Sequence, residues 1–339
     1  MRYGSFLNKQ ATISIVAPSF GVSGYPYQDR YENAKKKFLN LGYKLNESDY
    51  LYGITKGKSA PADIRASEFM KHYLDTGSDF VFSVAGGELM MEILPYIDFE
   101  TLKYAKPKMF MGYSDNTNLT FTLPVIADVA AIYGSNFSSF GMNNWDISLQ
   151  QSYDLITGKR LSFESYDKYE IEDLSKLEGN SLCGYNKTED VIYKSIRNQD
   201  EHFQGRIIGG CLDILQQFCG TCFDKVEQFL EKYKDDGFIW FMEACDLNVF
   251  GQRRAIFQMK NCGWFKNCKG IIYGRAVNSD PIFDYQTIDV LKDSFLNDNI
   301  PVVYGCDFGH LPPSWAIIAG SIAHFDLNGN KAKISYELR

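Results

Sequence analysis

Short apolar segments alternate with amphipathic ones over the first 135 residues, and this alternation constrains the fold more than any other feature of the chain. A short, continuous apolar run indicates a strand buried on both faces, whereas apolar residues recurring every three to four positions indicate a helix. The strands that we expect are 12–17, 79–85, 107–113 and 130–135, and the expected helices are 27–42, 61–77, 89–95 and 116–128. Strands and helices in alternation predict βαβ units, a parallel sheet and hence an α/β fold.

The alternation stops near residue 145, where a polar stretch rich in Ser, Asp and Lys begins. We expect this stretch to cross between two domains, as the length of 339 residues also suggests. Beyond it, strands are predicted at 237–243, 270–276 and 301–307, and two further strands flank an Asn-Gly turn at 328–329. We therefore predict an N-terminal α/β domain at 1–150, a crossing segment at 151–175, and a mixed or mainly β domain at 176–339.

Charge and composition exclude several classes of protein. The net charge of -7 argues against nucleic acid as a partner, because binding to its backbone requires a basic face. No apolar run approaches the roughly 20 residues of a membrane-spanning helix, and the N-terminus does not match a signal peptide. We therefore expect a cytoplasmic protein that contacts no membrane and keeps its eight cysteines reduced. Neither a metal-ligand spacing nor a phosphate or dinucleotide loop is present, so we predict no metal and no cofactor.

Three residues with complementary chemistry follow predicted strands. Ser114 comes after the strand 107–113, Glu243 ends the strand 237–243, and His310 lies in a glycine-flanked loop after the strand 301–307. Ligands of open parallel sheets lie beyond the carboxyl ends of the strands. A serine hydroxyl needs a base to become a nucleophile, and a carboxylate orients a histidine that serves as that base. These residues are our candidate nucleophile, acid and base.

Backbone amides near Ser114 could stabilise the negative charge that develops during acyl transfer. The N–H of Asp115 lies at the predicted start of a helix, where the helix dipole favours an anion. The Gly86-Gly87 pair follows the strand 79–85, and glycine allows a substrate to approach the backbone closely. We therefore expect an oxyanion hole formed by backbone groups.

Each candidate also has a purely structural interpretation. Ser114 could cap the helix that follows it, and Glu243 could be an ordinary charge in a surface ion pair. Asp115 and Asp307 are rival carboxylates. The other histidines lie in less suggestive surroundings: we expect His72 to be exposed on a helix, and the remaining two fall in a polar loop and in the terminal hairpin, at His202 and His324.

The order of the motifs resembles the LD-carboxypeptidase family of serine peptidases. The matching segments are TISIVAPS, AGG with ILPYID, PKMFMGYSDNTNL, GRIIGGCLDILQQFCGT, WFMEACD and YGCDFGH, and they span nearly the whole chain. This family includes murein tetrapeptide carboxypeptidases and the microcin C self-immunity hydrolases, which use a Ser-Glu-His triad. The resemblance is weakest between residues 140 and 200.

Carried over motif by motif, the resemblance implies that Ser114 is the nucleophile, Glu243 the acid and His310 the base. It places the oxyanion hole at the backbone of Gly87 and Asp115. It further implies a flavodoxin-like or Rossmann-like N-terminal domain, a β-rich swivelling C-terminal domain, no metal, and a homodimer. The triad would then span the domain interface.

Two departures from the family pattern concern the substrate. Many murein-processing members carry an arginine directly before the glycine pair, where this chain has Ala85, and Cys211 replaces the usual asparagine of the GGNL motif. Both changes look more like the microcin-immunity branch, which hydrolyses an amide between an acidic residue and a nucleotide-like group. We therefore predict a serine peptidase that cleaves a C-terminal amide in a small peptide or a peptide–nucleotide conjugate. The alternative is a non-catalytic, two-domain protein that binds a small ligand.

Overall fold

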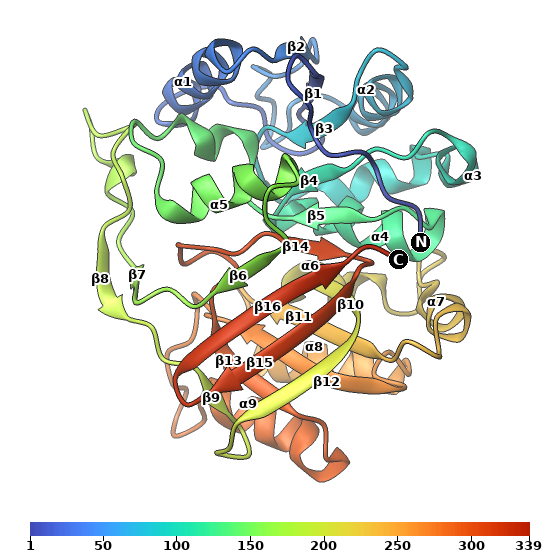
Figure 1. Ribbon diagram of the computed structural model, residues 1–339, viewed down its shortest axis with the longest axis vertical. Coiled ribbons are helices and arrows are strands. Elements are labelled where there is room, and N and C mark those ends of the chain that lie inside the picture. Colours follow the sequence, from blue (N-terminus) through green and yellow to red (C-terminus); the bar gives the residue numbers. More distant parts are fainter.

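The computed structural model describes residues 1–339 and places two β-sheets one above the other (Figure 1). The first sheet has the order β14-β5-β4-β3-β1-β2, with β1 (Thr12–Val16), β2 (Lys44–Glu47), β3 (Phe80–Ser83), β4 (Phe110–Gly112), β5 (Ala131–Tyr133) and β14 (Ile317–Ala319). Strands β1 to β5 pair in parallel, which confirms the predicted parallel sheet. The central strands are almost entirely buried, as continuous apolar runs require.

Helices connect these strands and cover the sheet. They are α1 (Tyr27–Asn40), α2 (Ala62–Leu74), α3 (Phe99–Tyr104), α4 (Thr117–Ala127) and the 3-10 helices η1 (Met90–Tyr96), η2 (Ser114–Asn116) and η3 (Phe137–Gly141). The buried face of α1 consists of Tyr31, Ala34 and Phe38, at the helical spacing that predicted it. The segment predicted as a helix up to Pro95 is instead the 3-10 helix η1, which includes that proline.

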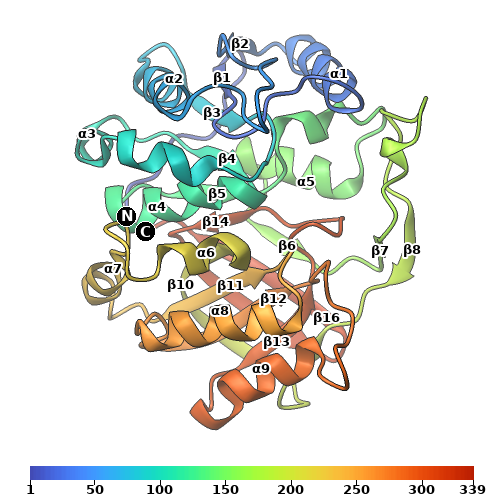
Figure 2. The ribbon, with the colours of Figure 1, turned by 180° about the vertical axis from the view of Figure 1, so that it is seen from behind.

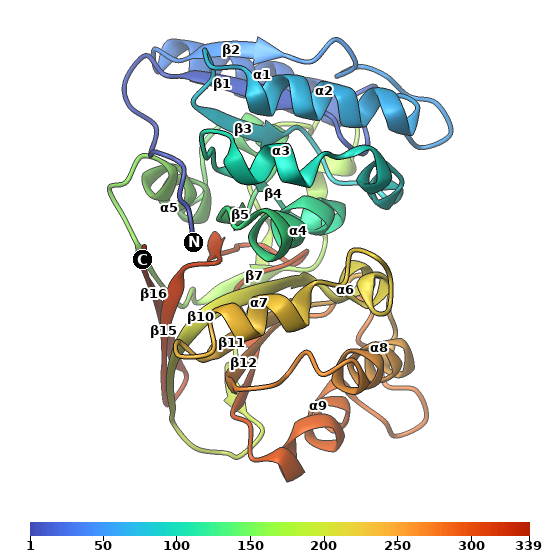
Figure 3. The same cartoon turned by 90° about the vertical axis from the view of Figure 1, so that its right-hand side faces the viewer.

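The second sheet has the order β6-β16-β15-β10-β11-β12-β13-β9. Its strands are β6 (Ser162–Glu164), β9 (Lys194–Ser195), β10 (Glu201–Cys211), β11 (Phe238–Glu243), β12 (Cys268–Gly274), β13 (Val302–Cys306), β15 (Ile322–Asn328) and β16 (Lys331–Glu337). The helices α6 (Leu212–Phe218), α7 (Val226–Lys232), α8 (Val249–Asn261) and α9 (Thr287–Phe295), with the 3-10 helix η5 (Leu296–Asp298), gather on one side of it (Figures 2 and 3). The three central strands β10, β11 and β12 are parallel, so their carboxyl ends meet at one edge.

The polar stretch near the middle of the chain has more regular structure than its sequence suggests. It contains α5 (Ile147–Ile156), the 3-10 helix η4 (Leu174–Lys176), and the hairpin strands β7 (Lys168–Glu170) and β8 (Lys187–Asp190), which run along one side of the molecule (Figure 1). The predicted domain limits at residues 150 and 175 stay a prediction. None of the helices combines the length and the apolarity that a membrane crossing requires.

The two sheets share a core, and one strand from near the C-terminus joins the first sheet. The predicted terminal hairpin is confirmed as β15 and β16. The residues just before it, Ile317–Ala319, form a separate strand, β14, which pairs antiparallel with β5 of the first sheet. Gly320 separates the two strands with a φ of +92°, a turn that the apolar pattern alone does not reveal. One apolar cluster includes Ile15 of β1 and Phe241 of β11, so the domains pack tightly against each other.

Candidate active site

Ser114 lies at a sharp turn between β4 and α4. Its φ of +66° is in the left-handed region, which residues with a side chain rarely occupy. Such strained residues cluster at functional sites, where the surrounding structure holds them in place. The Ser114 side chain does not cap α4, whose N-cap is Asn116. The neighbouring loop passes close to it, since a Cβ added at Gly86 would lie 3.2 Å from the Cβ of Ser114.

His310 and Glu243 come from the second sheet and meet Ser114 across the domain interface. The Nε2 atom of His310 lies 2.8 Å from Ser114 Oγ, and its Nδ1 atom lies 2.9 Å from Glu243 Oε2. Both distances are those of hydrogen bonds. With Nδ1 protonated, His310 donates to the carboxylate and accepts from the serine hydroxyl. The structure thus brings together all three candidate residues.

A glycine makes room for this contact. Gly309 precedes the histidine with a φ of +107°, and a Cβ there would lie 2.9 Å from Glu243 Oε2. Any side chain at this position would therefore displace the carboxylate as well as strain the backbone.

Burial and charge together set the protonation of His310. Burial lowers the pKa of His310, but the negative charge of Glu243, which is 0% exposed, outweighs it and holds this pKa well above its ordinary value. Cys245 and the ring of Tyr113 also lie against the imidazole, the latter with a centroid distance of 5.3 Å. Complete burial of Glu243 makes its charge more effective toward His310 and excludes the surface ion pair that the sequence left open.

The backbone amides expected to form an oxyanion hole flank Ser114. The N–H groups of Gly87 and Asp115 donate to no acceptor within the chain. Gly87 has a φ of +152°, and a Cβ there would lie 2.0 Å from Ser19 Oγ, so only glycine fits. The side chain of Asp115 is buried and has a structural role, because it accepts hydrogen bonds from the Met90 N–H at 2.9 Å and from Ser19 Oγ.

The other rival carboxylate and the remaining histidines lie away from this site. Asp307 is buried in an ion pair with Arg275 and accepts a hydrogen bond from Tyr193. The prediction that His72 is exposed is wrong: the side chain is 1% exposed and lies 3.2 Å from Ser14 Oγ, on the buried face of α2. The remaining two histidines lie on strands of the second sheet: His202, expected in a loop, is exposed on β10, and His324 is half-exposed on β15 of the terminal hairpin.

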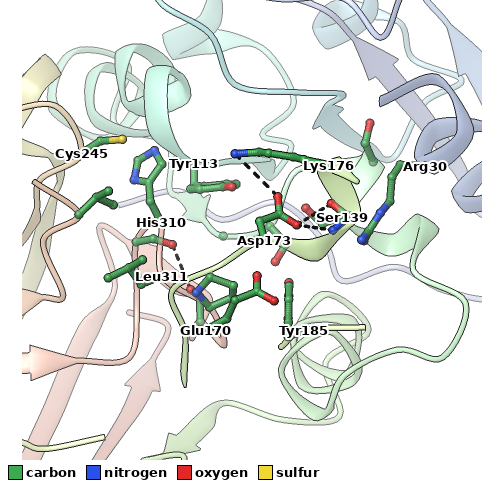
Figure 4. A pocket seen from close by; sticks show the side chains of 18 of the residues that line it. Arg30, Tyr113, Ser139, Glu170, Asp173, Lys176, Tyr185, Cys245, His310 and Leu311 are labelled. Atoms are coloured by element: carbon green, nitrogen blue, oxygen red, sulfur yellow. Dashed lines mark hydrogen bonds and ion pairs between the residues drawn. The ribbon is translucent and has the colours of Figure 1, made fainter. Parts of the chain in front are cut away.

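A cavity of about 440 Å³ opens beside His310, and sequence reasoning missed most of its lining (Figure 4). Its walls come from both domains, and the polar stretch that begins near residue 145 contributes Glu170, Asp173 and Tyr185. These residues lie in the polar stretch that showed no clear periodicity, so no pattern singled them out. No group of three or more His, Cys, Asp or Glu side chains is placed to hold a metal ion.

Comparisons with known proteins agree with this architecture. Residues 13–134 match the model of the LD-carboxypeptidase N-terminal domain, and residues 204–325 match that of the LD-carboxypeptidase C-terminal domain. The putative carboxypeptidase YocD of Bacillus subtilis is 24% identical over 92% of both chains. The microcin C7 self-immunity protein MccF of Escherichia coli is 24% identical over 97% of this chain and 92% of its own. The crystal structure of an MccF-like protein from Bacillus anthracis has a TM-score of 0.84 at 20% identity, over 100% of both chains.

The fold and these relatives define a two-domain hydrolase that acts on peptide bonds. The chain belongs to the LD-carboxypeptidase family. The expected fold class, a parallel-sheet α/β domain followed by a β-rich domain, is thereby confirmed.

Proposed function

We propose that this protein is a serine peptidase that hydrolyses a C-terminal amide in a small peptide or a peptide–nucleotide conjugate through Ser114, His310 and Glu243. The observation that carries the proposal is the continuous hydrogen-bonded chain from Ser114 Oγ through the imidazole to Glu243 Oε2. The strained backbone of Ser114 adds support, because it presents the hydroxyl at a turn between strand and helix.

The proposed reaction moves one proton at a time between Ser114, His310 and the leaving group. Ser114 Oγ attacks the carbonyl carbon while its proton moves to His310 Nε2, and Glu243 stabilises the imidazolium that forms. The tetrahedral intermediate collapses as His310 gives that proton to the leaving nitrogen, which departs as an amine and leaves an acyl-enzyme on Ser114. Water then donates a proton to His310 and attacks the ester, and the acid product leaves as the proton returns to Ser114.

The negative oxygen of each tetrahedral intermediate needs donors that are already in place. The unpartnered N–H groups of Gly87, on the neighbouring loop, and of Asp115, the residue after Ser114 in η2, supply two. Donors fixed in advance need no reorganisation during the reaction, and removing one from such a site costs about 10²- to 10³-fold in turnover.

The substrate is a small molecule that fits beside His310. A volume of about 440 Å³ falls within the range of small-ligand pockets and suits a short peptide or a nucleoside conjugate. Solved structures of MccF are described with aspartyl sulfamoyl adenosine and glutamyl sulfamoyl guanosine bound. The missing arginine before Gly86 and the presence of Cys211 favour the conjugate over the murein peptide.

A mass-spectrometric assay tests the proposal with purified protein. A murein L,D-tetrapeptide and an aspartyl-adenylate-type carboxamide conjugate are incubated side by side, with Ser114→Ala as the control. We expect cleavage of the conjugate by the wild type and none by Ser114→Ala. Loss of the terminal D-alanine alone would make the protein a murein peptidase. Equal turnover by Ser114→Ala would refute the triad, and binding of either compound without turnover would favour the non-catalytic alternative.

A further inference from the structure

Tyr133 is a buried residue that touches two members of the proposed triad and was not among the candidates from sequence. It is the last residue of β5 and is 1% exposed. Its hydroxyl donates a hydrogen bond to Glu243 Oε1 at 2.5 Å and accepts one from the backbone N–H of Ser114 at 3.2 Å. The same hydroxyl therefore contacts both ends of the Ser-His-Glu chain.

These contacts close a ring of hydrogen bonds. The ring runs from Ser114 Oγ to His310, from His310 to Glu243, from Glu243 to Tyr133, and back to the backbone of Ser114. Ser114 and Tyr133 lie at the ends of strands of the first sheet, whereas Glu243 is the last residue of β11 and His310 follows β13, both in the second sheet. The ring thus crosses between the domains twice and ties the nucleophile to the acid independently of the histidine.

We propose that Tyr133 is a positioning residue of this hydrolase, which fixes Glu243 and Ser114 relative to each other. The inference rests on the proposed function. Glu243 is 0% exposed, and its Oε1 atom would have no donor without the phenol. A buried carboxylate oxygen without a donor is costly, so the side chain would rotate or recruit the proton of His310. The left-handed backbone of Ser114 would lose the bond that holds its N–H.

The phenol is suited to this role because it stays neutral. Burial, followed by the charge of Glu243, raises the pKa of Tyr133 well above its ordinary value, so the hydroxyl keeps its proton and remains a donor. The ring itself is held by packing: its centroid lies 5.4 Å from that of Phe241 and 6.4 Å from that of Tyr113. A phenylalanine at position 133 would retain this packing and remove only the hydroxyl.

The test compares Tyr133→Phe with Tyr73→Phe in the full-length protein. Tyr73 is a matched control, because this buried phenol in α2 also donates one hydrogen bond and accepts another, both with the backbone of Lys108. The readout is inactivation by a fluorophosphonate, which needs no identified substrate and separates kinact from KI. We expect Tyr133→Phe to lower kinact about 10- to 100-fold, the effect of a lost hydrogen bond to a charged group, with KI changed less than about twofold. Tyr73→Phe should react like the wild type.

A rescue arm separates the hydroxyl from a general effect on folding. Incorporation of 3-fluorotyrosine at position 133 keeps the hydroxyl and should restore kinact to within about threefold of the wild type. Equal kinact for Tyr133→Phe and the wild type, an equal loss in Tyr73→Phe, or no rescue by fluorotyrosine would each overturn the inference. A wild-type protein that is not labelled on Ser114 would instead refute the proposed function, and the inference with it.

Discussion

Replacing Glu243 by glutamine tests how the triad depends on a carboxylate that offers two acceptors. Both oxygens of Glu243 receive a hydrogen bond, one from Tyr133 at 2.5 Å and one from His310 at 2.9 Å. An amide of the same shape has one acceptor and one donor group. If its NH2 group faces His310, the imidazole must carry its proton on Nε2 and cannot accept the proton of Ser114. If its NH2 group faces Tyr133, the phenol must give up its donated bond.

The expected loss follows from this conflict and from the missing charge. Removing the carboxylate charge while keeping the shape of the side chain costs triad hydrolases about 10⁴-fold in turnover, so we expect Glu243→Gln to lose about 10³- to 10⁴-fold in kinact toward a fluorophosphonate. The charge of Glu243 also raises the pKa of His310. Because the base must be neutral to act, reactivity in the wild type rises as the pH rises through this pKa, and Glu243→Gln should move that rise to lower pH.

The assay measures kinact between pH 5 and pH 10 for the wild type, Glu243→Gln and a control, Glu201→Gln. Glu201 is also buried, but it pairs with Arg197 at the start of β10, away from the site. The control should match the wild type at every pH. A Glu243→Gln protein that reacts within about tenfold of the wild type, with an unmoved pH profile, would refute the role assigned to the carboxylate.

Three further predictions concern the glycine before His310, the buried carboxyl of Glu170 and the oligomeric state. Gly309→Ala should lower kinact by about 10²-fold, because a Cβ there would lie 2.9 Å from Glu243 Oε2 and push the carboxylate away from His310; a rate like that of the wild type would show that the loop adapts freely. Burial raises the pKa of Glu170 in the folded state, so this carboxyl destabilises the fold as the pH rises through that pKa. Glu170→Gln should therefore raise Tm more at pH 8 than at pH 4.5, and an equal shift at both pH values would contradict this sign. The homodimer that the family resemblance implies predicts twice the mass of the chain in size-exclusion chromatography with light scattering, and a monomer at all concentrations would exclude it.

The fold was largely predictable because short buried strands leave an unambiguous apolar signal. Each of the four strands expected in the first 135 residues is present, within a few residues of the predicted limits. The strand β14 was missed because Ile317–Ala319 continues directly into an alternating hairpin, and only the turn at Gly320 separates them. The helix expected at 89–95 is instead the 3-10 helix η1, which extends past Pro95 to Tyr96.

Less of the candidate site than of the fold could be predicted from the sequence. Ser114, Glu243 and His310 could be singled out because each follows a strong strand signal, and strand ends meet at one edge of a sheet. Tyr133 and the cavity residue Glu170 could not, since their positions depend on contacts between the domains and on a polar segment without periodicity. A buried tyrosine at a strand end also fits an ordinary core, and only the two hydrogen bonds of its hydroxyl set it apart.

The measurement that tests the central claim most directly is peptide mapping by mass spectrometry after treatment with a fluorophosphonate. Only a serine activated by a neighbouring base should react at a useful rate. The account predicts a single adduct, on the peptide that contains Ser114, and no adduct on Ser114→Ala. An unlabelled wild-type protein, or an adduct on a different serine, would contradict it.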